Sequence, residues 1–205
     1  MNNDLYEQAA SHGYIAKAGG TAQHIVMDIE TLSTAKNAAI VSIGAVAITD
    51  EGDINGMFYY PVDIDSCLEA GMVTDAATIK WWMNQNEAAR NVFNAPASDL
   101  LVVLCNFTVW CNTYTEQNKR TYFWGNGPEF DNAILDTAFR LVSTALTPPW
   151  KYNEAQSLRT ISYINHVLNL GVVYPEPRVA HHALFDAEAE AKFIINVLKA
   201  LKERV

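Results

Sequence analysis

The chain has 205 residues, of which 50% are hydrophobic and 18% are charged, and its formal net charge is −9. This length fits one domain with a sizeable core, and the apolar content argues against a disordered chain. The acidic balance argues against a protein that grips a long duplex by neutralising many phosphates, although it permits an enzyme that handles one strand end. No apolar run reaches the about 18 residues of a membrane-spanning helix, so we expect no membrane partner.

The N-terminal segment and the cysteines indicate a cytoplasmic protein. Residues 1–8 include acids and lack the apolar stretch of a secretory signal. The three cysteines are odd in number and contain no zinc-type pair, so reduced thiols are the plain interpretation. They are Cys67, Cys105 and Cys111.

In chain order, residues 1–20 are expected to form a weakly structured arm with a short helix over 5–10, before a single domain over 21–205. Three strands follow the arm. They share an apolar composition with turn residues between them, which predicts an antiparallel meander. Their expected ranges are 25–29, 38–48 and 54–62.

Helical patterns and one more strand, over 120–124, fill the rest of the chain. Asp75 is a suitable N-cap for a helix over 76–85, and Ser98 for one over 100–115. Further helices are expected over 87–93, 128–142, 157–168 and 183–202. This order predicts an α/β fold, in which a mixed β-sheet (a three-strand antiparallel meander plus parallel strands) is flanked by helices.

Two acids interrupt the first apolar strand. Asp28 and Glu30 are two residues apart, so both side chains leave the same face of the strand. Burial among Ile25, Val26 and Ile29 would be costly without a cation beside the acids. The alternative is an exposed strand end that carries two solvated acids.

Three further candidates lie at the start of a helix or in the loop just before one. Asp131 follows a glycine-rich loop, where taken alone it would suit a helix N-terminus through the dipole. Asp186 lies in the first turn of the last helix. His181, five residues earlier, would lie on another face of that helix, so we place it in the preceding loop. His182 is the competing imidazole, and a surface histidine is the plain alternative for both.

Four carboxylates with one imidazole suit phosphodiester hydrolysis assisted by two metals. Hard divalent cations such as Mg²⁺ or Mn²⁺ prefer oxygen ligands. A pair of such ions about 4 Å apart activates a water and stabilises the leaving oxygen. A neutral histidine beside the attacking water can serve as a general base.

These motifs resemble those of the DEDDh superfamily of 3′–5′ exonucleases, which have a ribonuclease H-like fold. The similarity covers about residues 23–202 and includes Asp28-Ile-Glu30-Thr31, Phe130-Asp131 and His181-His-Ala-Leu-Phe-Asp186. The chain is most similar to the phage-type exodeoxyribonucleases, through a segment with paired tryptophans at 78–85 and another at 157–161. A related branch includes bacterial exoribonucleases, which leaves the sugar open.

The resemblance implies a metal-dependent exonuclease that releases nucleoside 5′-monophosphates from the 3′ end of single-stranded DNA. The implied setting is the cytoplasm of a bacterium or of a phage-infected cell. An exoribonuclease with the same site is the alternative, and an inactive nucleic-acid-binding subunit or a ribonuclease H-type endonuclease are rivals. The sequence assigns no oligomeric state.

The resemblance also implies a role for each matching residue. Two divalent cations, Mg²⁺ or Mn²⁺, would bind Asp28, Glu30, Asp131 and Asp186, and His181 would be the base. The expected substrate contacts are Thr31, Leu32, Asn126 and Trp82, with the leucine wedged against the last base. Stretch 32–37 lacks the glycine that is common after this motif. Adjacent tryptophans on a helix point about 100° apart, so one of Trp81 and Trp82 is expected in the core.

Overall fold

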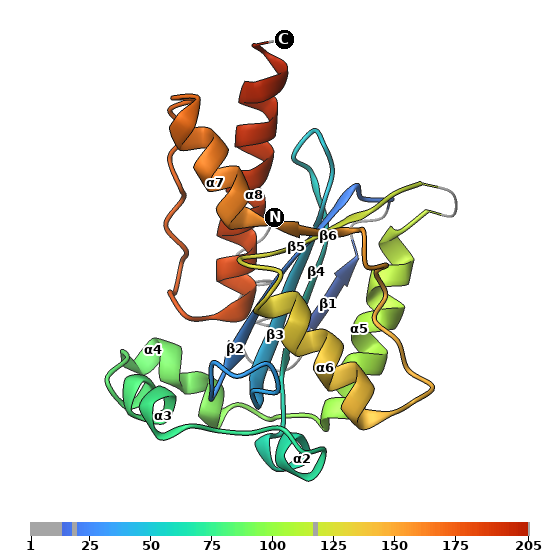
Figure 1. The fold of residues 1–205 in the computed structure, drawn as a ribbon, viewed down its shortest axis with the longest axis vertical. Helices are drawn as coiled ribbons and strands as arrows, with labels where there is room; N and C mark the ends of the chain where they lie inside the picture. The colour runs from blue at the N-terminus through green and yellow to red at the C-terminus, as the bar shows by residue number, and fades with distance from the viewer. Residues whose placement is uncertain (1–13, 18–19, 117–118, 205) are drawn as a thin grey trace.

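A computed structural model describes residues 14–17, 20–116 and 119–204 (Figure 1). A six-stranded sheet has the order β1-β4-β3-β2-β5-β6. Its central strands β2, β3 and β4 form an antiparallel meander, and β5 runs parallel to β2 with β6 parallel to β5. The strands are β1 (Tyr14–Lys17), β2 (His24–Thr31), β3 (Ile40–Ile48), β4 (Ile54–Pro61), β5 (Tyr122–Gly125) and β6 (Ala155–Ser157). The predicted mixed sheet is confirmed.

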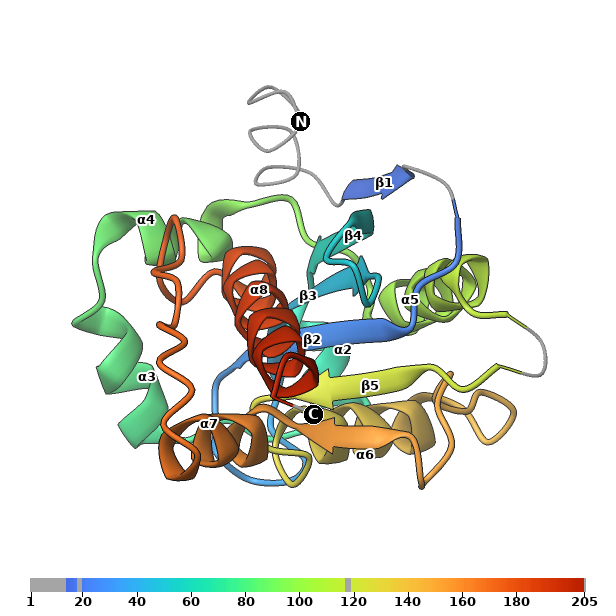
Figure 2. The same cartoon turned by 90° about the horizontal axis from the view of Figure 1, so that it is seen from above.

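Helices cover both faces of this sheet. In Figures 1 and 2, α8 lies on one side and α5 and α6 lie on the other. The helices are α2 (Ile64–Glu69), α3 (Ala76–Met83), α4 (Glu87–Arg90), the 3₁₀ turn η1 (Asn91–Asn94), α5 (Leu100–Tyr114), α6 (Asp131–Val142), α7 (Leu158–Val167) and α8 (Ala183–Lys202). Within the described ranges, no helix has the length and apolar character needed to cross a bilayer.

The alternation of side chains along β2 divides it between two cores. Ile25 and Met27 pack in the core shared with α5 and α6. Val26 packs in a second core with α8. Because side chains of a strand alternate between faces, Asp28 and Glu30 follow Val26 and face α8. The two acids therefore lie between the sheet and the C-terminal helix.

Gly44 lets the start of α8 lie directly on the sheet. It pairs with Asp28 across the β2–β3 ladder. A Cβ atom at this position would overlap the backbone of Ala183, the first residue of α8. The absence of a side chain thus brings the segment with His181 and Asp186 close to β2.

Some elements differ from the expectations. Asp99, rather than Ser98, caps α5, since its side chain accepts hydrogen bonds from two backbone N–H groups of the first turn. Helix α2 and the short strand β6 were not anticipated. Tyr14–Lys17, expected to be weakly structured, pairs with β4. The rest of the proposed arm, including the helix over 5–10, falls outside the described residues except for Gly20, and the domain boundary at residue 21 stays a prediction.

Candidate active site

The acids named from the sequence converge at one end of β2. Asp28 and Glu30 come from β2, Asp131 from the first turn of α6 and Asp186 from the first turn of α8. Glu30, His181 and Asp186 each offer a ligand atom within 4.8 Å of the other two. Asp131 and Asp186 also lie close enough to raise the pKa values of both β2 acids.

This crowding shifts the pKa values of the carboxyl groups upward. Burial raises the pKa of Glu30 to about 8, with further contributions from the charges of Asp186 and Asp131. Burial, followed by the charge of Glu30, raises the pKa of Asp28 well above its ordinary range. Such groups ionise together only if positive charge enters the cluster, and hard divalent cations suit their oxygen atoms.

The loop after β5 holds Asp131 in place. Its Oδ2 accepts hydrogen bonds from the backbone N–H groups of Asn126 at 2.9 Å and Gly127 at 3.4 Å. A Cβ on Gly125 would lie 2.8 Å from the Asp131 Cβ, so the glycine allows the close approach. Burial nevertheless raises the pKa of Asp131 to about 6, against the opposing effect of these N–H groups.

The two adjacent histidines have different surroundings. His181 precedes α8 with a φ of 62°, a conformation uncommon for a residue with a side chain, and its ring meets the Trp81 ring edge-to-face at 4.7 Å. The His182 ring instead stacks between Tyr59 at 4.4 Å and Phe185 at 4.3 Å. Burial lowers the pKa of His182 to about 4. The His182 backbone N–H donates to Asp186 Oδ2 at 3.1 Å, but only the imidazole of His181 lies among the ligand atoms of Glu30 and Asp186.

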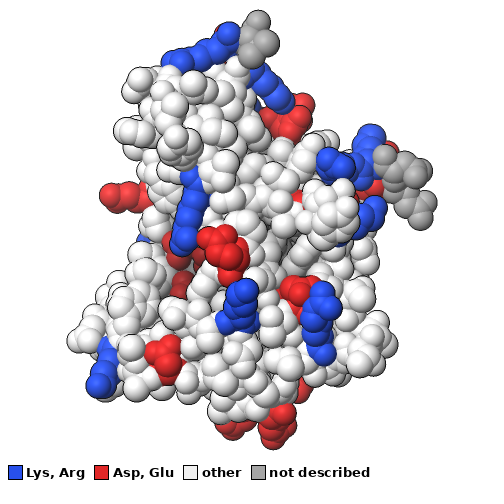
Figure 3. All heavy atoms as spheres, viewed as in Figure 1, with Lys and Arg blue, Asp and Glu red and all other residues white. Residues whose placement is uncertain are grey.

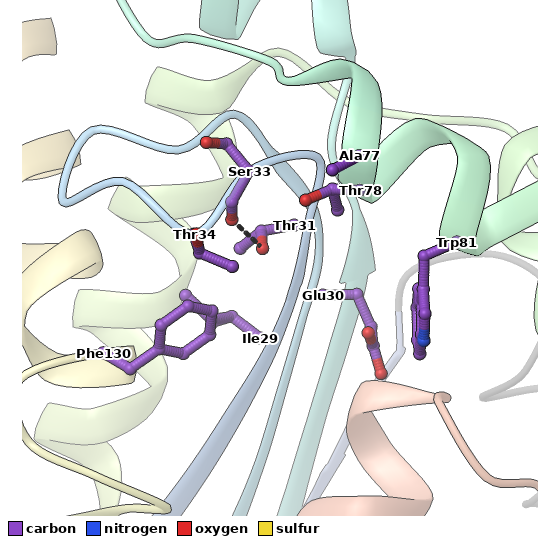
Figure 4. Close-up of a pocket in the computed structure, with 9 residues that line it drawn as sticks. All are labelled: Ile29, Glu30, Thr31, Ser33, Thr34, Ala77, Thr78, Trp81 and Phe130. Atoms are coloured by element: carbon purple, nitrogen blue, oxygen red, sulfur yellow. Dashed lines mark hydrogen bonds between the residues drawn. The ribbon is translucent and has the colours of Figure 1, made fainter.

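A pocket of about 460 Å³ adjoins the acids at Glu30 (Figure 4). In Figure 4, Phe130 and Ile29 lie on one side, and Trp81 and Glu30 lie on the other. Its lining residues are Ile29, Glu30, Thr31, Ser33, Thr34, Ala77, Thr78, Trp81 and Phe130. A cavity of this size is in the range of small-molecule sites.

Two expected substrate contacts are not among the residues that line this pocket. Leu32 is buried in the core, after a register shift between Glu30 and Thr31. Trp82 is also buried, and its indole N–H donates to the Thr31 carbonyl oxygen at 2.9 Å. Trp81, 41% exposed, lines the pocket instead.

Of the other two expected substrate contacts, Thr31 lines the pocket and Asn126 does not. The Thr31 hydroxyl donates to the Ser33 carbonyl oxygen at 2.8 Å. Asn126 is engaged within the protein, because its side-chain oxygen accepts from Arg159 Nε at 3.1 Å.

The structure adds an acid that the motif analysis missed. Glu190 of α8 is buried, and its charge contributes to the raised pKa of Asp28. Burial, then the charges of Asp131 and Asp186, raise the pKa of Glu190 itself. The available signal was its position four residues after Asp186 on one helix.

The raised pKa values predict how stability depends on pH in the metal-free protein. The folded state keeps protons on Glu30 and its neighbours above pH 4.5, where the unfolded chain releases them, so stability falls as pH rises toward 8. His24 and His182, whose pKa values burial lowers, act in the opposite direction below pH 6.5.

Melting temperatures of the metal-free protein are therefore compared between pH 6.5 and pH 8, above the range in which the two histidines contribute. Each retained proton costs about 1 kcal/mol per pH unit, and the melting temperature changes by about 2–4 °C per kcal/mol in a chain of this size. Calorimetry in chelator should show a lower melting temperature at pH 8, and Mn²⁺ should restore it. A level or rising melting temperature in chelator would contradict the clustered arrangement.

Comparisons with known proteins agree with this geometry. Residues 23–198 match the family model described as the 3′-5′ exoribonuclease Rv2179c-like domain. No curated protein matches the chain significantly.

Solved nuclease structures share the fold at low sequence identity. Cell-death related nuclease 4 (CRN-4) has a TM-score of 0.60 and 15% identity, over 90% of this chain and 66% of that chain. The nuclease domain of 3′hExo, a DEDDh family member bound to rAMP, has a TM-score of 0.56 and 14% identity, over 86% and 91% of the two chains. E. coli Exonuclease I in complex with a dA16 oligonucleotide has a TM-score of 0.56 and 14% identity, over 85% and 41%.

These likenesses show the ribonuclease H-like fold, whereas the family match spans most of the chain and includes all four motif acids and His181. The chain therefore belongs to the family of the 3′-5′ exoribonuclease Rv2179c-like domain.

Proposed function

We propose that the protein hydrolyses single-stranded nucleic acid from the 3′ end and releases nucleoside 5′-monophosphates. The observation that carries this proposal is the cluster of acids with His181 at a pocket large enough for a terminal nucleotide. Lys and Arg side chains are scattered over the face in Figure 3 and form no continuous stripe there. That surface suits engagement of a strand end better than a long phosphate track.

The buried acids fit a pair of divalent cations, for which we propose Mg²⁺ or Mn²⁺. The proposed ligands are Asp28, Glu30, Asp131 and Asp186, and burial raises the pKa of each of these four carboxyl groups. When bound, such cations polarise the scissile phosphate and stabilise charge on the leaving oxygen. The backbone N–H groups of Asn126 and Gly127 keep Asp131 oriented toward the other acids.

His181 is the proposed general base, which takes a proton from the attacking water. Its side chain comes from the loop before α8 and lies within 4.8 Å of Glu30 and Asp186 ligand atoms. Trp81 limits its position through the edge-to-face ring contact.

The pocket is the proposed site of the 3′-terminal nucleoside. Phe130 and Trp81 offer aromatic surfaces against which a base can pack. Thr31 and Glu30 lie where the pocket meets the acids, close to the expected position of the sugar. Trp81 thereby takes the role expected of Trp82, and Phe130 with Ile29 takes the role expected of Leu32.

Trp81→Ala is expected to raise KM about tenfold, since a base–aromatic contact contributes about 1–3 kcal/mol. Steady-state kinetics on a short single strand measures the change. Met83→Ala is the matched control, because Met83 lies on the same helix, is exposed and is not part of the pocket. An unchanged KM for Trp81→Ala would remove Trp81 from the proposed substrate site.

Two sugars remain candidates for the substrate. The family description favours RNA, whereas the resemblance to phage-type enzymes favours DNA. The deciding experiment offers matched 5′-labelled RNA and DNA strands with Mn²⁺, with chelator and with an Asp28→Asn variant. The proposal predicts a ladder that shortens stepwise from the 3′ end of at least one strand, and degradation of one alone identifies the sugar. Internal cuts would favour an endonuclease, and no Mn²⁺-dependent cleavage would favour the inactive binding subunit.

A further inference from the structure

Glu190 is an acid of the cluster to which the motifs assign no role. It follows Asp186 by four residues on α8, so the two side chains leave the same face of the helix. That helix packs on β2 and β3. The charges that act on Glu190 are those of Asp131 and Asp186, and Glu190 in turn acts on Asp28. Its carboxyl group therefore borders the space that the four motif acids enclose.

The surroundings of Glu190 leave part of its carboxyl group unsatisfied. The side chain is only 1% exposed. The nearby Asn126 side chain opposes the upward shift of the Glu190 pKa, but Oε2 has no hydrogen-bond partner among the described residues. An unpaired buried carboxyl oxygen is costly, and more so beside other acids. A cation in the enclosed space would satisfy this atom.

We propose that Glu190 is a fifth carboxylate ligand of the divalent-cation centre, an inference that rests on the function proposed above. Oxygen donors of this type suit Mg²⁺ and Mn²⁺, and affinity for such ions rises with the number of charged ligands. Two divalent cations carry four positive charges, so a fifth carboxylate leaves the centre with an excess negative charge that holds the cations more tightly. The rival role is a neutral acid that only bonds to Asn126.

Glu190→Gln separates the two roles, because glutamine keeps the size and hydrogen-bonding capacity of the side chain but removes the charge. Glu188→Gln is the matched control: it lies on the same helix and pairs with Lys192 at 2.6 Å. Titration calorimetry of Mn²⁺ into the metal-free proteins provides a readout that does not depend on turnover. Wild type, Asp28→Asn and both glutamine variants are compared at one pH.

Glu190→Gln is expected to bind Mn²⁺ about tenfold or more weakly, while Glu188→Gln matches wild type and Asp28→Asn loses most of the binding. If Glu190→Gln binds Mn²⁺ as tightly as wild type does, Glu190 is not a ligand, and the proposed function is unaffected. A wild type that binds no Mn²⁺, or binds it as Asp28→Asn does, overturns the proposed function as well. If glutamine prevents folding, Glu190→Asp withdraws the carboxyl by one methylene, and unchanged Mn²⁺ affinity in that variant is again contradictory.

Discussion

Asp28→Asn is expected to lower the rate of 3′-end hydrolysis by about 10³-fold or more, because charge stabilisation by the cations supplies a large part of the catalysis. Asp28 lies at the centre of the cluster, where the charges of Glu30, Glu190, Asp131 and Asp186 all act on it. Asparagine keeps the shape of the side chain and offers a neutral oxygen, so cation affinity falls while the fold is retained. Single-turnover kinetics at several Mn²⁺ concentrations measures the loss.

Asp53→Asn is the control for this prediction, since Asp53 lies in the exposed turn between β3 and β4. It should hydrolyse the strand at the wild-type rate. Retention of more than about a tenth of the rate by Asp28→Asn at saturating Mn²⁺ would mean that Asp28 is dispensable. Hydrolysis would then have to proceed without Asp28, the acid on which the charges of the other four acids act.

His181→Ala is expected to lower kcat by about 10²–10⁴-fold, the usual contribution of a positioned general base. KM and Mn²⁺ affinity should change much less, because the acids and the pocket remain. Kinetics and titration calorimetry on the same preparation distinguish loss of proton transfer from loss of cations.

His166→Ala, an exposed histidine of α7, should behave like wild type. His182 is unsuitable as a control, because its ring packs between Tyr59 and Phe185 and truncation would leave a cavity. If His181→Ala retains full kcat, the base is another group, and the endonuclease interpretation, which needs no such histidine, gains support.

The sequence predicted the positions of the candidate side chains where its signals were local. The spacing of Asp28 and Glu30 on an apolar strand was enough to place both on one face of β2. The five-residue separation of His181 and Asp186 correctly excluded a shared helical face and placed His181 in the loop. The difference between the two histidines then followed from packing, since only His182 lies between aromatic rings.

The sequence was insufficient to predict those side-chain positions that depend on tertiary packing. A helical pattern shows that Trp81 and Trp82 diverge, but it does not show which one faces the core. Leu32 lies in the core after a register shift between Glu30 and Thr31, and no residue type in this stretch predicts that shift. In the sequence, Glu190 is one of several polar residues of an Ala- and Glu-rich helix. Only the packing of that helix on β2 shows that Glu190 lies near the other acids. The strands β1 and β6 are too short for a periodic pattern and exist through pairing with β4 and β5.

The most direct test is a crystal structure of the protein soaked with Mn²⁺ and a nucleoside 5′-monophosphate, with anomalous scattering recorded to locate manganese. We expect two manganese peaks bounded by Asp28, Glu30, Asp131 and Asp186, with the base between Phe130 and Trp81 and the phosphate toward the metals. Manganese bound elsewhere, or none among these acids at millimolar concentration, would contradict this expectation.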